Sequence, residues 1–62
     1  QKGIILEVKY AHDGNLEAAS QKAVEQIEKT NYAQELQDEG IDTILKYGIA
    51  FYKKRCKVEL KK

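Results

Sequence analysis

The sequence contains no proline, tryptophan or methionine, and it has a single cysteine. That cysteine, Cys56, excludes an internal disulfide, and the sequence has no cluster of Cys and His to hold a structural zinc. The longest apolar run, residues 48–52, is far shorter than the ~20 residues that a membrane-spanning helix needs. Gln1 and Lys2 lead directly into a strand-like segment, which is unlike a secretory signal. We therefore expect a cytoplasmic protein with a reduced thiol.

The composition predicts one small globular domain over residues 1–62. Apolar residues make up 42% of the chain and charged residues 34%, which is ordinary for a folded domain. A domain of ~60 residues buries only ~60% of the surface that its unfolded chain exposes, so its core is marginal. Because the sequence starts at Gln1 and not at Met, we expect it to be a piece of a longer protein.

Charge is divided unevenly along the chain. Residues 1–51 carry five lysines and nine acids, whereas residues 52–62 carry six basic residues and one acid. A basic stripe of this kind can follow the phosphates of nucleic acid. Lysines on an edge strand also prevent edge-to-edge aggregation, and charge alone leaves both interpretations open. The candidate nucleic-acid-binding residues are Lys53, Lys54, Arg55 and Lys57.

The first segment, residues 3–10, has the β-branched and aromatic composition of a strand. Because side chains alternate along a strand, one face is apolar and the other becomes charged towards its end. The apolar face holds Ile4, Leu6, Val8 and Tyr10. The other face holds Ile5, Glu7 and Lys9.

Residues 16–38 have the pattern of two helices. Apolar residues recur at spacings of three and four from Leu16 onward, after an Asp-Gly-Asn turn that can supply the N-cap. Asn31 followed by Gln34 predicts a capping box and a second short helix over residues 32–38, with Tyr32 facing inward. Gly40 then marks the end of this helix.

The remainder of the chain predicts two strands. Residues 41–52 are apolar on both faces, which is typical of a central strand. A tight connection at residues 53–55 leads to a one-sided edge strand, residues 56–61. In this strand Cys56 alternates with charged residues, and we expect it to be a small core residue.

These elements predict an α/β fold in the order β-α-α-β-β, with a three-stranded mixed sheet and the helices on one face. The first two strands should be parallel across the helical connection, and the last should return antiparallel. Ile5, Gly48 and Ala50 lie on faces that also need a cover, which the two helices cannot supply. Either the chain forms a homodimer, or residues upstream provide the second layer.

The segment Glu7-Val8-Lys9 is the main candidate for chemistry. A carboxylate and an amine two residues apart on a strand project from the same face, with Cβ atoms roughly 6–7 Å apart. At the carboxyl end of a parallel strand they would face the crevice where α/β proteins bind ligands. A carboxylate can bind Mg²⁺, and a lysine can stabilise charge on a phosphate. The same pattern also occurs as an ordinary exposed pair on a strand.

The order of the motifs resembles the C-terminal half of the PD-(D/E)xK nuclease superfamily, part of a restriction-endonuclease-like fold. The strand ending in ILEVKY, the QI pair at Gln26 and Ile27, and the phrase YGIAFY at residues 47–52 carry this resemblance. It covers essentially the whole chain. The similarity is greatest to the bacterial subfamily that is often found behind an AAA-ATPase-like domain of unknown function.

The resemblance implies specific roles. Glu7 would be the acidic metal ligand, Lys9 the catalytic lysine, and Val8 would bind metal through its main-chain carbonyl. Gln26 corresponds to a glutamine that nuclease members place near the active site, or it is an ordinary solvated residue. In the family, the partner tyrosine usually lies four residues after this glutamine. Here Tyr32 lies six residues after Gln26, so Tyr32 is equally consistent with a core aromatic.

One departure from the family pattern concerns the metal. The superfamily has an Asp on the strand before the E-x-K strand, and Asp13 and Asp42 lie in loops that do not match it. Glu7 alone is a poor Mg²⁺ site. We therefore expect a fragment of a Mg²⁺-dependent nuclease domain that acts on nucleic acid, DNA rather than RNA, and that is inactive by itself. The alternatives are a non-catalytic nucleic-acid-binding module and a self-associating α/β unit.

Overall fold

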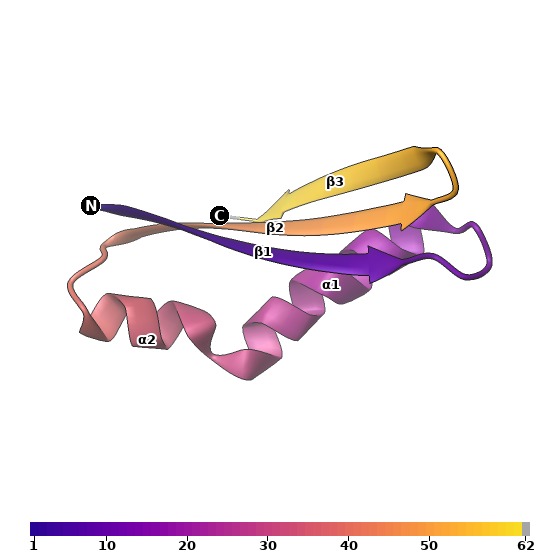
Figure 1. The fold of residues 1–62 in the computed structure, drawn as a ribbon. Coiled ribbons are helices and arrows are strands. Elements are labelled where there is room, and N and C mark those ends of the chain that lie inside the picture. Colours follow the sequence, from indigo (N-terminus) through magenta and orange to yellow (C-terminus); the bar gives the residue numbers. More distant parts are fainter. Residues whose placement is uncertain (62) are drawn as a thin grey trace.

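The computed structural model describes residues 1–61 and confirms the predicted α/β order (Figure 1). The elements are β1 (Lys2–Tyr10), α1 (Leu16–Thr30), α2 (Tyr32–Asp38), β2 (Thr43–Tyr52) and β3 (Arg55–Lys61). Within this part of the chain, neither helix has the length and hydrophobicity that crossing a membrane requires.

The three strands form one mixed sheet in the order β1-β2-β3. β1 and β2 are parallel and are joined by the segment that contains both helices, whereas β2 and β3 form an antiparallel hairpin. Lys53 turns the hairpin with a positive φ of 53°, an uncommon conformation for a residue other than glycine. β2 is therefore the central strand and β3 an edge, as the sequence predicts. β1 forms the other edge of this sheet.

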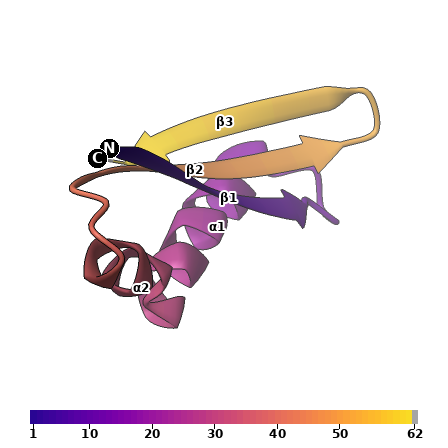
Figure 2. The ribbon, with the colours of Figure 1, turned by 60° about the vertical axis from the view of Figure 1, so that its left-hand side comes forward.

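Both helices lie on the same side of the sheet (Figures 1 and 2). They cover the face that carries Ile5, Gly48 and Ala50. The core under α1 is small, and its buried apolar residues are Ile5, Ala11, Ala23, Val24, Ile27 and Ala50.

The opposite face of the sheet is apolar and exposed, which reverses the expected arrangement. The sequence pattern predicts that the face with Ile5, Gly48 and Ala50 lacks a cover, but α1 packs on this face. The large apolar residues exposed on the open face range from 62% exposure at Ile4 to 39% at Phe51. They are Ile4, Leu6, Val8, Tyr10, Phe51, Val58 and Leu60. Cys56 is also exposed, so its expected place in a core is wrong.

Small residues explain why α1 covers this face. An added Cβ atom at Gly48 would meet the Ser20 carbonyl oxygen and would lie 2.7 Å from Val24 Cγ2 and 2.9 Å from Val24 N. The main chain of α1 therefore rests almost directly on β2. Ser20, Ala23 and Ala50 are fully buried at this contact. The larger side chains of the other face would hold a helix farther from the sheet.

The helix ends follow the prediction in part. Asn15 caps α1, because its side-chain oxygen accepts a hydrogen bond of 3.1 Å from Ala18 N. The predicted capping box at Asn31 is wrong: Asn31 has a positive φ of 60° and makes no side-chain cap, and Gln34 instead donates to Asp38. Asn31 links the two helices in a left-handed conformation that asparagine tolerates better than most residues.

We predict that Gly48→Ala lowers the free energy of unfolding by about 1–3 kcal/mol, because the new methyl group collides with the main chain of α1. Gly3→Ala is the matched control, since there a Cβ atom would meet only side-chain atoms of Ile41 and Leu36. Urea denaturation followed by circular dichroism measures both. Equal effects for the two variants would contradict the close contact at Gly48.

Candidate active site at the carboxyl end of strand β1

Glu7 and Lys9 project from the helix-covered face of β1, and both are half-buried. Their partners on β2 are Gly48 and Ala50, the two residues against which α1 packs. Because these partners are so small, α1 sits over β2, and the Glu7 and Lys9 side chains rise beside it from β1. The side chain of Val8 projects from the open face and is exposed.

Lys9 and Gln26 line the same cavity, of about 280 Å³, between β1 and α1. Lys22, Glu25 and Lys29 complete its lining, so three lysines face one acid. The net positive charge of this cavity favours an anion. The structure thus brings together two of the three predicted catalytic residues as lining residues of one cavity, while their catalytic roles stay predictions.

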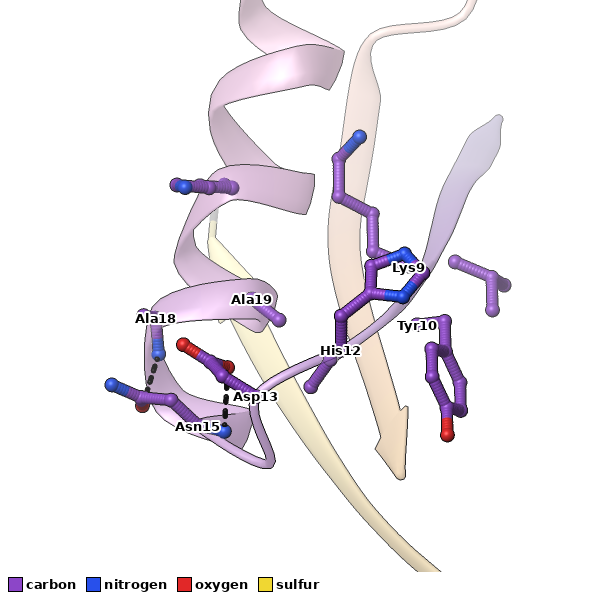
Figure 3. Close-up of a pocket in the computed structure, with 10 residues that line it drawn as sticks. Lys9, Tyr10, His12, Asp13, Asn15, Ala18 and Ala19 are labelled. Atoms are coloured by element: carbon purple, nitrogen blue, oxygen red, sulfur yellow. Dashed lines mark hydrogen bonds between the residues drawn. The ribbon is translucent and has the colours of Figure 1, made fainter. Parts of the chain in front are cut away.

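A larger groove of about 590 Å³ adjoins this cavity at the end of β1, and Lys9 and Lys22 line both. Figure 3 shows Lys9 extending on the helix side of β1, with the His12 ring beside it and Tyr10 farther from α1. Two hydrogen bonds order the loop that closes the groove. Asp13 Oδ1 accepts from Asn15 N at 3.0 Å, and Asn15 Oδ1 accepts from Ala18 N at 3.1 Å.

Sequence reasoning missed the contributions of Lys22, Lys29 and His12. The signal for the two lysines is helical spacing: Lys22, Gln26 and Lys29 are separated by four and three residues and therefore share one face of α1. His12 has no such signal, because its position depends on the path of the loop after β1.

The other predicted residues, Tyr32 and the basic residues of the hairpin, do not line the cavity that holds Lys9 and Gln26. Tyr32 is 47% exposed on α2 and does not line the cavity that holds Lys9 and Gln26, so it is not a core aromatic. The basic residues of the hairpin are all exposed, and its turn lies at the same end of the sheet as the loop after β1 (Figure 1). They are Lys53, Lys54, Arg55 and Lys57.

The described residues supply only part of a metal site. Within residues 1–61, no three His, Cys, Asp or Glu side chains come together in a way that could hold a metal ion. Glu7 fits as one carboxylate ligand, and the Val8 carbonyl follows it on the same strand. Mg²⁺ is usually held by one or two carboxylates together with waters and phosphate oxygens. Glu7 is therefore one of the ligands that such a site would use.

An ion-pair network ties α1 to the sheet. Lys46 Nζ on β2 donates to both carboxylate oxygens of Glu28 at 3.1 Å, and Lys61 Nζ on β3 lies 3.4 Å from Glu28 Oε1. The hydrogen bonds from Lys46 are the main reason that the pKa of Glu28 lies below its ordinary value, and Lys61 adds to this effect. The network helps to hold α1, and with it Gln26, over the sheet.

Comparison with protein families gives a match to the model of the PD-(D/E)XK nuclease superfamily over residues 1–61. The chain belongs to this superfamily. The triplet Glu7-Val8-Lys9 has the (D/E)XK pattern that appears in the name of the superfamily. Searches of curated proteins and of solved structures gave no significant match. The family match confirms the predicted resemblance at the level of the superfamily and supports a nuclease-like domain.

We predict that Glu28→Gln lowers the melting temperature slightly at neutral pH and has no effect in acid. Because the folded-state pKa of Glu28 is lowered, its charge stabilises the fold above the ordinary carboxyl value of 4.5. This contribution is lost as the pH falls below that value and through the folded-state pKa. Thermal unfolding of both proteins at several pH values measures the difference. A difference that persists at pH values where Glu28 is protonated would contradict the role of the ion pairs.

Proposed function

We propose that this nuclease-like chain supplies the metal-binding and phosphate-binding part of a Mg²⁺-dependent phosphodiesterase site that acts on DNA. The observation that carries the proposal is the shared face of Glu7 and Lys9 beside a cavity lined by three lysines and Gln26. Membership of the superfamily supports a nucleic-acid substrate.

Each residue has a role that its chemistry allows. The Glu7 carboxylate and the Val8 carbonyl hold the metal ion, and Lys9 binds an oxygen of the phosphate and stabilises its developing charge. Gln26, which lines the cavity with Lys9, orients the phosphate or a water through its amide group. When bound, Mg²⁺ polarises the phosphate and lowers the pKa of its own water. The basic hairpin residues attract the flanking phosphates of the DNA.

In this proposal, the chain is inactive by itself because it supplies only one carboxylate ligand for the metal ion. Within the described residues, Glu7 belongs to no group of three or more His, Cys, Asp or Glu side chains that could hold a metal ion. The second carboxylate would come from residues other than these 62, in a larger nuclease domain of which this chain forms one part.

We predict weak Mn²⁺ binding at Glu7. In ¹H–¹⁵N NMR spectra of the chain with DNA, paramagnetic Mn²⁺ should broaden the amide signals of Glu7, Val8 and Lys9 first. Glu7→Gln should remove this local broadening, because it removes the charged ligand. The matched control is Glu35→Gln, since Glu35 is exposed on α2. Broadening that is unchanged in Glu7→Gln would contradict the proposed metal ligand.

The same samples test catalysis. We expect no cleavage of labelled DNA by the chain with Mg²⁺ or Mn²⁺, because the donor set is incomplete. Cleavage that Glu7→Ala abolishes would contradict the expected inactivity but would support the assigned role of Glu7. Cleavage that Glu7→Ala leaves unchanged would come from a contaminant.

The open apolar face favours self-association as a second candidate function. Its strands are about 4.8 Å apart and about 30 Å long, so the face covers about 400 Å². Two copies packed face to face would bury about 800 Å², less than the ~1,200 Å² of stable interfaces. Any homodimer formed in this way would therefore be weak and would depend on concentration.

We predict that Leu6→Lys weakens this self-association, because Leu6 lies on the open face of β1 and is exposed. Tyr32→Lys introduces the same charge on α2, away from this face, and should have no effect. Sedimentation equilibrium over a range of concentrations measures the association. A monomeric wild-type chain at all concentrations would exclude the homodimer.

A further inference from the structure

Aromatic side chains gather at the end of the sheet that carries the candidate active site. The ring of Tyr10 packs 5.0 Å from His12, 5.2 Å from Phe51 and 5.8 Å from Tyr52, measured between ring centroids. The contacts with His12 and Phe51 are edge-to-face. Although Tyr10 has three aromatic neighbours, it stays 42% exposed. The rings therefore form a partly open platform at the carboxyl ends of β1 and β2.

Cations surround this platform. Lys53 Nζ lies 5.2 Å from the centroid of the Tyr52 ring, and Arg55 Cζ lies 5.7 Å from it. On the other side, Tyr10 and His12 line the 590 Å³ groove together with Lys9 and Lys22. One acid, Asp13, also lines this groove, where its Oδ1 accepts a hydrogen bond from Asn15 N.

The combination of rings and cations distinguishes this end from the rest of the open face. The other large apolar residues exposed on that face are aliphatic: Ile4, Leu6, Val8, Val58 and Leu60. Aliphatic residues can pack against any apolar partner. Aromatic rings flanked by lysine and arginine are the pattern that binds single-stranded nucleic acid, because rings stack on bases while cations bind phosphates.

We propose that Tyr10 stacks on an unpaired base of the nucleic acid whose phosphate lies against Lys9, while His12, whose ring stands at 76° to that of Tyr10, meets the edge of the same base. This inference rests on the proposed function and specifies its substrate as single-stranded at the site. Lys9 and Lys22 line both the groove with the rings and the cavity with Gln26, so one nucleotide can place its base in the first and its phosphate in the second. A base inside a duplex is already stacked on its neighbours and does not offer its face to a protein ring.

The test compares the affinity of the chain for a fluorescein-labelled single strand of ~12 nucleotides and for the matching blunt duplex, by fluorescence anisotropy in EDTA. We expect tighter binding of the single strand. Tyr10→Leu should weaken single-strand binding about 10-fold while changing duplex binding less than about 2-fold, because it keeps the apolar contact but loses the stacking ring. Tyr10→Phe should retain wild-type affinity.

His12→Ala is the second variant, because His12 is exposed in a loop and its loss does not affect the core. It should also weaken single-strand binding. Tyr32→Leu is the matched control, since Tyr32 is exposed on α2 at the other end of the sheet (Figure 1). Circular dichroism checks that each variant is folded.

Two results would overturn the inference. One is equal affinity for the single strand and the duplex with no effect of Tyr10→Leu or His12→Ala. The other is the absence of binding to either nucleic acid. Neither result decides the metal site, because Mn²⁺ broadening at Glu7 is a separate measurement. If that broadening and the nucleic-acid binding were both absent, the proposed function would fail as well.

Discussion

The contact between the main chain of α1 and Gly48 on β2 determines the arrangement of the rest of the structure. A Cβ atom at Gly48 would collide with main-chain atoms of Ser20 and Val24, so the main chain of α1 approaches β2 only because residue 48 has no side chain. This contact fixes which face of the sheet the helices cover. It also fixes the height of α1 above β1, and therefore the space that remains for Glu7 and Lys9 beside it.

The candidate site is a consequence of this packing. A helix on the opposite face would have left Lys9 without the cavity that it lines together with residues of α1. With α1 over Gly48 and Ala50, its Lys22, Gln26 and Lys29 side chains face the charged end of β1 and enclose a positive cavity. The ion pairs of Glu28 with β2 and β3 hold the helix from another direction.

Much of the fold follows from local patterns. The β-branched and aromatic composition of β1, helical spacing after Leu16, and glycine at position 40 predict the element order and most boundaries, because these signals depend only on neighbouring residues. The failures have identifiable reasons. The sequence pattern predicts that Asn31 caps a helix. Asparagine is also favoured in the left-handed conformation, and Asn31 adopts this conformation to link the two helices. Cys56 alternates like a core residue, yet it lies on the face that no helix covers.

The sequence by itself determined the strand and helix order, the E-x-K pattern of residues 7–9, and the common face from which the Glu7 and Lys9 side chains project. Alternation along a strand is a local property, so no distant contact is needed to predict it. Only the tertiary structure decided which face α1 covers and which residues join the site. Both depend on how closely a helix approaches a strand distant from it in sequence, and small residues at Ser20, Ala23, Gly48 and Ala50 set that distance.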